Sequence, residues 1–177
     1  MGRLPTPFLS LTAMDCHAHA NLQQILPVLR PWLMAQGSLT AKIEALTGER
    51  LTVRPQFEGR ERLSRVEAQQ LGLSANRPHS AWVREALLYG QADGEAWVSA
   101  RSVFPFVSLT GEARQLANLG TTPIGYVMFG RGGAVLDKRW FDKTEKGWQR
   151  TTLYDWQGRK LLISELFLAE FTKNILV

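Results

Sequence analysis

Two charged residues lie on otherwise apolar faces of predicted strands, and their chemical types suggest an enclosed polar site. Arg84 lies in the segment Ala81–Leu88, and Glu165 lies in the segment Leu161–Leu168. Both segments are rich in β-forming residues, so residues two apart share one face of a strand. A guanidinium and a carboxylate on core-facing positions are costly to bury unless they are paired or hold a ligand.

The same two residues support two interpretations, and the sequence leaves both open. In the first, Arg84 binds a carboxylate of a small acid through two parallel hydrogen bonds, and Glu165 accepts a hydrogen bond from a hydroxyl. Predicted helix starts at Leu39 and Ile124 would add backbone N–H groups that lack intrahelical partners. In the second, Arg84 and Glu165 form a buried ion pair without any ligand.

Two short motifs suggest other chemistry but lack the residues to support it. His17 and His19 have the spacing of a metal-binding His-x-His pair. The barrels that use this pair need a longer chain and further ligands, of which only His79 remains, so we predict no metal site. The segment 130–133 is glycine-rich like a phosphate loop, but it lacks the third glycine of that fingerprint and precedes a predicted strand.

The elements that must position these residues follow from capping signals and from alternation of apolar and polar residues. Strands are predicted over residues 51–58, 80–89, 95–104, 134–141, 148–156 and 159–167. Helices are predicted after the caps Ser38 and Ser64, over residues 111–119 with Thr110 as the cap, and over residues 123–129 with Thr122 as the cap. Helices that interrupt strands without regular alternation are typical of an α+β fold.

We therefore predict one α+β domain over residues 1–177. Its six-stranded, largely antiparallel sheet and inserted helices are expected to enclose a small-ligand cavity. Residues 1–20 are expected to form a loosely structured lead-in.

The composition is that of a soluble globular protein, with 45% hydrophobic and 21% charged residues among 177. The single cysteine, Cys16, excludes an internal disulfide and favours a reducing compartment. No apolar run is long enough for a signal peptide or a membrane span, so we expect a cytoplasmic protein without stable membrane insertion.

The formal net charge is +5, and the basic residues of the chain cluster between Arg50 and Arg65 and between Arg131 and Arg150. Without a recognised nucleic-acid-binding module these clusters indicate solvated surface, so we expect no nucleic-acid partner.

Five motifs occur in consistent order between residues 80 and 168. They are Trp82-Val83-Arg84-Glu85-Ala86-Leu87-Leu88, Asp93-Gly94-Glu95-Ala96-Trp97, Ala100-Arg101-Ser102-Val103, residues 116–125, and Glu165-Leu166-Phe167-Leu168. This ordered set resembles the chorismate pyruvate-lyase family of bacterial ubiquinone biosynthesis, with a weaker match over residues 38–46. Ile124 stands where leucine is more usual, Ala169 stands where a proline is common, and residues 49–79 diverge from the family pattern.

The resemblance implies a lyase that converts chorismate to 4-hydroxybenzoate and pyruvate, the first committed step of ubiquinone biosynthesis, with no metal or organic cofactor. It implies that the product lies in an enclosed cavity behind helical flaps. Arg84 and Glu165 would be the catalytic and substrate-binding residues, with main-chain contacts from Leu39 and Ile124. Glu165 would either hold the ring hydroxyl or act as a general base. We expect chorismate and 4-hydroxybenzoate as small-molecule partners, and a monomer.

The alternative function is a non-catalytic, small-molecule-sensing domain of the same fold, as in some bacterial transcription regulators. Such domains normally follow a DNA-binding winged helix. Residues 1–50 are too short and too irregular to supply one, and this favours the enzyme.

Overall fold

Alternation of apolar and polar residues produces six strands that pair in one antiparallel sheet. The computed structural model describes residues 22–74 and 76–176. The strands are β1 (Thr52–Arg62), β2 (Ser80–Tyr89), β3 (Val98–Pro105), β4 (Val135–Thr144), β5 (Gly147–Trp156) and β6 (Arg159–Phe167). Their order in the sheet is β1-β2-β3-β6-β5-β4, and every neighbouring pair is antiparallel. The predicted α+β class and antiparallel sheet are confirmed. The predicted lead-in over residues 1–20 lies outside the described residues.

Short helices fill the connections between the strands. The α-helices are α1 (Arg30–Leu33), α2 (Leu39–Thr47), α3 (Arg65–Gln70), α4 (Ile124–Met128) and α5 (Ala169–Ile175). The 3-10 helices are η1 (Leu22–Gln24), η2 (Phe106–Ser108) and η3 (Gly111–Asn118). No helix in the described parts of the chain is both long and apolar enough to span a membrane.

Local sequence signals account for two of the helix starts. Ser38 accepts a hydrogen bond from the backbone N–H of Ala41 and begins α2, which ends at Gly48 in the left-handed conformation (φ 71°). Ser64 and Glu67 form a reciprocal capping box at the start of α3. Both predictions are confirmed.

Two other helix predictions differ from the structure. The segment predicted as a helix over residues 111–119 is the 3-10 helix η3, and Thr110 makes no side-chain cap. The next helix begins at Ile124 rather than at Pro123, which is the N-cap in an extended conformation (φ −59°, ψ 130°). The carbonyl of Thr122, just before it, accepts a hydrogen bond from Arg84.

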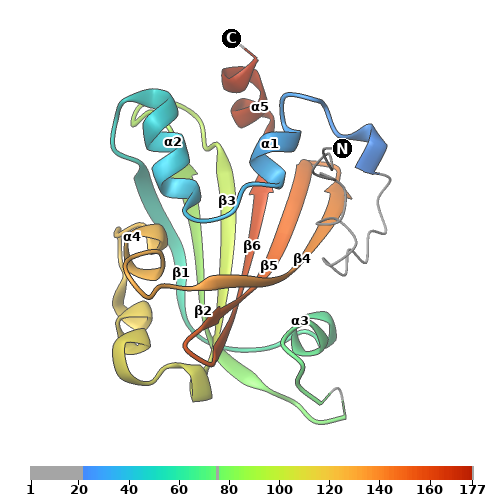
Figure 1. Cartoon of the computed structure of the whole chain (residues 1–177), viewed down its shortest axis with the longest axis vertical. Helices are drawn as coiled ribbons and strands as arrows, with labels where there is room; N and C mark the ends of the chain where they lie inside the picture. Colours follow the sequence, from blue (N-terminus) through green and yellow to red (C-terminus); the bar gives the residue numbers. More distant parts are fainter. Residues whose placement is uncertain (1–21, 75, 177) are drawn as a thin grey trace, which may run out of the picture.

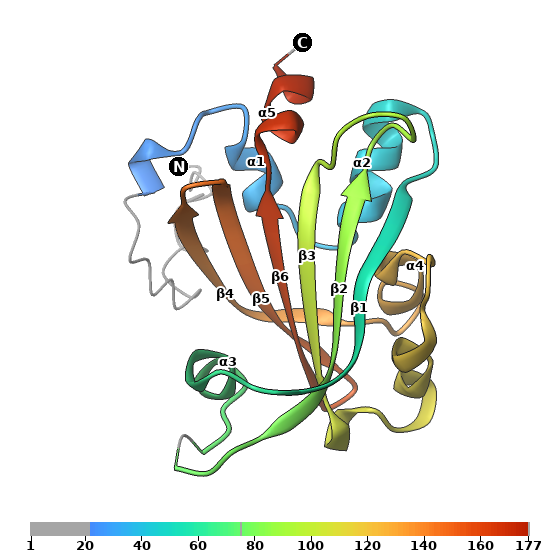
Figure 2. The same ribbon diagram turned by 180° about the vertical axis from the view of Figure 1, so that it is seen from behind.

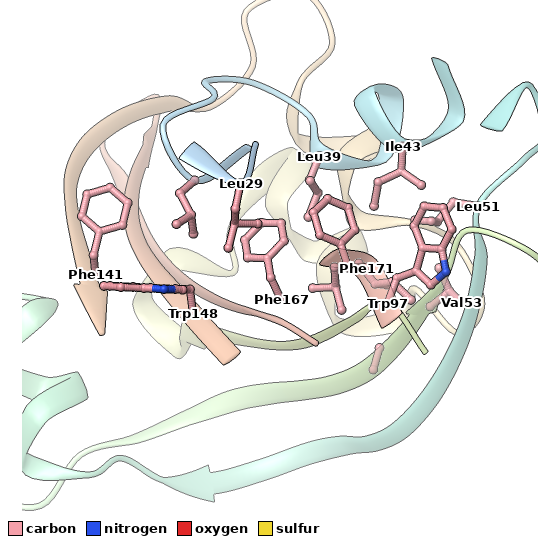
Figure 3. Close-up of a cluster of buried hydrophobic side chains, with 14 of the residues drawn as sticks. Leu29, Leu39, Ile43, Leu51, Val53, Trp97, Phe141, Trp148, Phe167 and Phe171 are labelled. Atoms are coloured by element: carbon pink, nitrogen blue, oxygen red, sulfur yellow. The ribbon is translucent and has the colours of Figure 1, made fainter. Parts of the chain in front are cut away.

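Most of the helices cover one face of the sheet. Figure 1 shows α1 and α2 in front of the sheet, with α4 beside its β1–β2 edge. On this face α1, α2 and α5 pack on the sheet around Phe167 and Phe171; Figure 3 shows Leu29 and Leu39 directed towards those rings. A second cluster joins η3 and α4 to Phe104 and Ile163.

The opposite face carries a smaller apolar cluster near α3. Leu63 and Leu71, which flank α3, pack with Val83, Val103 and Leu162 of the sheet. Seen from behind, much of the length of the strands is free of helices (Figure 2). The helix-covered face is therefore the side on which side chains can be enclosed, and Arg84 and Glu165 both lie there.

Candidate functional site

The strand register brings polar residues from all six strands together on the helix-covered face. Antiparallel partners point to the same side of a sheet. One row across the sheet contains Glu58, Arg84, Ser102, Ile163, Thr152 and Arg139. The neighbouring row contains Ala86, Ala100, Glu165, Arg150 and Phe141. Four of the five charged residues in these rows are buried, and Glu58 at the edge of the sheet is partly exposed.

Arg84 is 2% exposed and binds the chain at two of its nitrogens. Its Nε donates to Glu58 Oε1 at 2.9 Å, and its Nη2 donates to the carbonyls of Gly120 (2.9 Å) and Thr122 (3.2 Å). Burial lowers the pKa of Arg84 and Glu58 partly offsets this shift, so the group remains a cation at neutral pH. Nη1 makes no hydrogen bond with the described residues and is the donor that a ligand can reach without displacing one of these partners.

Glu165 is paired with an arginine other than Arg84. Its Oε2 accepts a hydrogen bond from Arg150 Nε at 2.5 Å, across the β5–β6 pair. Glu165 is 8% exposed and Arg150 is fully buried. Burial alone would lower the pKa of Arg150, but the neighbouring carboxylate outweighs it and the net pKa is raised. The Arg84–Glu165 ion pair considered from the sequence is therefore absent, because both side chains have other partners.

The sequence interpretation missed two buried arginines, Arg139 and Arg150. Both lie in the basic stretch expected to be solvated surface, yet both are 0% exposed. Both donate from Nη1 to the carbonyls of Leu33 and Ala35 at the end of α1. The last carbonyls of a helix lack intrahelical partners and carry partial negative charge, so they are suitable acceptors for buried cations. This correction places two more positive charges beside Glu165.

A tyrosine completes this cluster. Tyr154 is 3% exposed, and burial, followed by the charge of Glu165, raises the pKa of its phenol. The positive charges of Arg150 and Arg139 act in the opposite direction and only partly offset the rise. Tyr154 is therefore a neutral phenol at physiological pH.

The two helix starts predicted to supply backbone contacts pack against each other. Leu39 is the first residue of α2, and Ile124 is the first residue of α4. A Cβ placed on Gly125 would clash with Ser38 Oγ and lie 2.8 Å from Thr40 Oγ1, so only glycine allows this approach. Whether the N–H groups of Leu39 and Ile124 contact a ligand remains a prediction.

One side-chain contact holds the two helices together at the surface. The Tyr126 hydroxyl on α4 donates to Glu44 Oε1 on α2. The same carboxylate oxygen accepts a hydrogen bond from the backbone N–H of Leu51 at 2.9 Å. We call the segment 109–130, which includes η3 and α4, the flap. Its contacts with Arg84 and Glu44 connect it to both the site and α2.

The other face of the sheet contains a polar hollow beneath α3, lined in part by Arg101, Gln70 and Thr151. Arg101 there binds the carboxylates of Glu61, Glu67 and Glu85 at 2.7–2.9 Å. Three carboxylates thus surround this single positive charge. The residues His17 and His19 lie outside the described residues, and no cluster of three metal-binding side chains occurs within residues 22–74 and 76–176.

Comparison with known proteins identifies the family. The family model described as "Chorismate lyase" matches residues 14–176. This chain belongs to the chorismate lyase family. A protein of Psychrobacter cryohalolentis named "Probable chorismate pyruvate-lyase" is 49% identical over 149 residues, which cover 82% of this chain and 88% of the relative. The "Chorismate pyruvate-lyase" of Yersinia enterocolitica is 35% identical over 140 residues, which cover 77% of this chain and 79% of the relative.

Among solved structures, PhnF from Mycobacterium smegmatis is similar to this chorismate lyase family member with a TM-score of 0.52. The two chains are 12% identical, and the similarity covers 77% of this chain and 66% of that chain. At that identity the likeness shows a shared fold only. The resemblance found in the sequence motifs is thus confirmed at the level of the family.

Proposed function

We propose that this member of the family converts chorismate to 4-hydroxybenzoate and pyruvate on the helix-covered face of its sheet. The observation that carries the proposal is the placement of Arg84 and Glu165. Both are buried, both lie on this face with β3 between their strands, and they are not paired with each other. Between them the sheet presents the short side chains of Ala100 and Ser102.

The reaction needs little chemistry from the protein. In a six-membered cyclic transfer, the C4–H bond of chorismate breaks and its hydrogen moves to the methylene carbon of the enolpyruvyl group. The C3–O bond breaks, and its electrons form the carbonyl of pyruvate. The C4–H electrons form the C3–C4 double bond that completes the aromatic ring. The protein has to hold the reactive conformer and stabilise the polar transition state.

Each charged side chain has a role in this scheme. Arg84 binds the ring carboxylate with Nη1. The indole N–H of Trp82 is a second donor on the same face of β2, because it is buried and has no hydrogen-bond partner among the described residues. Glu165 holds the C4 hydroxyl through its free oxygen while Arg150 fixes its orientation. The backbone N–H groups of Leu39 and Ile124 contact the ligand from above.

The flap gives this site its enclosure. The carbonyls of Gly120 and Thr122 bind Arg84 directly, so the flap and the carboxylate-binding residue form one hydrogen-bonded unit. Entry of the substrate requires the flap to separate from α2, where Tyr126 and Glu44 hold it. We further propose a cytoplasmic monomer that uses no metal or organic cofactor and binds no nucleic acid.

Incubation of the purified protein with chorismate tests the proposal against the sensing alternative. A lyase releases 4-hydroxybenzoate over many turnovers, which chromatography follows directly. A sensing domain binds chorismate or 4-hydroxybenzoate and leaves chorismate intact, and that result would overturn the enzymatic assignment.

A further inference from the structure

The helix-covered face contains more positive charge than its described carboxylates balance. Arg84 is paired with Glu58, and Arg150 is paired with Glu165. Arg139 is 0% exposed and forms no ion pair with a carboxylate in residues 22–74 and 76–176. A buried charge without a counter-charge is costly unless a ligand supplies one. The imbalance therefore indicates a place for an anion beside Arg139.

The hydrogen bonds of Arg139 show which of its nitrogens is available. Nε donates to Thr152 Oγ1 at 2.8 Å, and Nη1 donates to the carbonyls of Leu33 (3.1 Å) and Ala35 (2.7 Å). Nη2 is buried and has no partner with hydrogen-bond geometry among the described residues, and the neighbouring Tyr154 hydroxyl, which acts on the pKa of this guanidinium, supplies no negative charge as a neutral phenol. Buried charged donors are almost always satisfied, and leaving one unpaired carries a large desolvation cost. Three fixed bonds hold the guanidinium so that Nη2 is presented in one direction.

The position of Arg139 matches the chemistry of the proposed substrate. Chorismate has one carboxylate on the ring and a second on the enolpyruvyl ether at C3, next to the C4 hydroxyl. If Arg84 binds the ring carboxylate and Glu165 binds the hydroxyl, the ether extends at the Glu165 end of the site. Arg139 lies on that side of the sheet, because it pairs with Thr152 on β5, two residues along the strand from Arg150, which pairs with Glu165.

We propose that Arg139 binds the enolpyruvyl carboxylate of chorismate through Nη2, and that the site therefore has a second anion-binding position besides Arg84. This inference rests on the proposed lyase function and specifies how its substrate is recognised. After the C3–O bond breaks, this carboxylate leaves with pyruvate, whereas 4-hydroxybenzoate keeps only the carboxylate at Arg84. Arg139 should thus contribute to the affinity for substrate and not to the affinity for the aromatic product.

Two stable ligands separate these contributions. The first is 4-hydroxybenzoate, and the second is 3-(carboxymethoxy)-4-hydroxybenzoate, an unreactive analogue with a second carboxylate at the ether position. Calorimetry gives both dissociation constants for the wild-type protein and for Arg139→Gln. We expect roughly 10- to 100-fold weaker binding of the dicarboxylate, as for loss of a charged hydrogen bond, with little change for 4-hydroxybenzoate. The KM for chorismate should rise in parallel.

Two further variants keep the test decisive. Lys138→Gln removes the same charge from the exposed neighbouring position on β4 and should leave the ratio of the two dissociation constants unchanged. Arg139→Lys keeps the charge but loses the fixed geometry, so it should weaken dicarboxylate binding less than Arg139→Gln does. If Arg139→Gln does not fold, Arg139→Lys takes its place in the comparison with wild type.

Equal losses for both ligands, or no loss for either, would overturn the role of Arg139. Failure of the wild-type protein to bind 4-hydroxybenzoate or to turn over chorismate would instead reject the proposed function itself.

Discussion

Arg84 and Glu165 lie on the same face of the sheet, and each is held by a different partner from a neighbouring strand. Glu58 on β1 binds Arg84, and Arg150 on β5 binds Glu165. The two partners lie on the outer sides of the pair, so the space above β3 between Arg84 and Glu165 is not bridged by an ion pair. The proposed ligand, with a carboxylate at one end and a hydroxyl at the other, would join Arg84 to Glu165 without breaking either pair.

Replacement of Arg84 should separate ligand binding from structural pairing. Arg84→Ala removes a buried, charge-assisted donor, and we expect it to cost about 2–4 kcal/mol in the binding of 4-hydroxybenzoate or in kcat/KM for chorismate. Glu58→Gln is the matched control, because it breaks the same ion pair but leaves the guanidinium in place. Calorimetry and steady-state kinetics compare the two. If Glu58→Gln loses as much binding as Arg84→Ala, Arg84 serves the fold and not the ligand.

Glu165→Gln should distinguish orientation of the hydroxyl from proton abstraction. Glutamine keeps a carbonyl acceptor, and the cyclic transfer needs no base from the protein. We therefore expect a loss in the single-turnover rate nearer the low end of the roughly 10²- to 10⁴-fold range of general acid–base catalysis, together with weaker product binding. A loss of four orders in the chemical step with unchanged affinity for 4-hydroxybenzoate would make Glu165 the base.

The same substitution has a cost in stability. Glu165→Gln leaves Arg150 buried without its counter-charge, which typically costs about 3–5 kcal/mol when one partner of a buried pair is removed. Arg150→Gln in the same background should recover part of this loss. Denaturant unfolding of the single and double variants measures the coupling between the two residues, and additive losses would contradict a direct interaction.

The contact between Tyr126 and Glu44 should control how fast the product leaves. Tyr126→Phe removes the hydroxyl that joins α4 to α2 and leaves the ring in place. We expect 4-hydroxybenzoate to dissociate about two- to tenfold faster, the range for loss of one hydrogen bond, with no change in the single-turnover rate. Stopped-flow displacement of the product measures the first rate. An unchanged dissociation rate would show that the flap opens elsewhere.

Glu67 should stabilise the fold in a pH-dependent manner. Burial alone would raise the pKa of Glu67, but hydrogen bonds from Arg101 and Ser64 lower it below its usual value. A carboxyl whose pKa is lowered by folding stabilises the folded state above its unfolded pKa, and this contribution disappears as the pH falls through the folded pKa.

We therefore expect Glu67→Gln to lose about 1–2 kcal/mol at pH 7, and we expect the difference from wild type to shrink below about pH 4.5. Glu61→Gln, which removes a more exposed partner of Arg101, is the control and should lose less. Chemical unfolding across this pH range gives the comparison. A difference that does not depend on pH would contradict the role assigned to the carboxylate.

Strand alternation predicted part of the fold very closely. The predicted strands 80–89 and 159–167 have the observed bounds of β2 and β6. The strand predicted from Glu95 begins at Val98 instead. The buried Trp97 just before it bonds through its N–H to the carbonyl of Leu88 and through its C=O to the N–H of Leu168. Contacts of this kind connect distant segments and leave no local pattern in the sequence.

The site was only partly predictable for the same reason. The alternation that singled out Arg84 also applies to Arg139 and Arg150, which share their strand faces with Phe141 and Trp148. Their burial depends on the carbonyls at the end of α1, more than one hundred residues earlier in the chain. Composition alone made these arginines look like solvated surface, although the alternation of their strands carried the signal that they were buried.

The products formed from chorismate test the central claim most directly. Purified protein is incubated with chorismate, with and without a metal chelator, and 4-hydroxybenzoate and pyruvate are quantified in the same samples. We predict equal amounts of the two products over many turnovers and no effect of the chelator, because the proposed cyclic transfer needs no metal. Chorismate that is bound but not consumed, or activity that the chelator abolishes and zinc restores, would contradict this account.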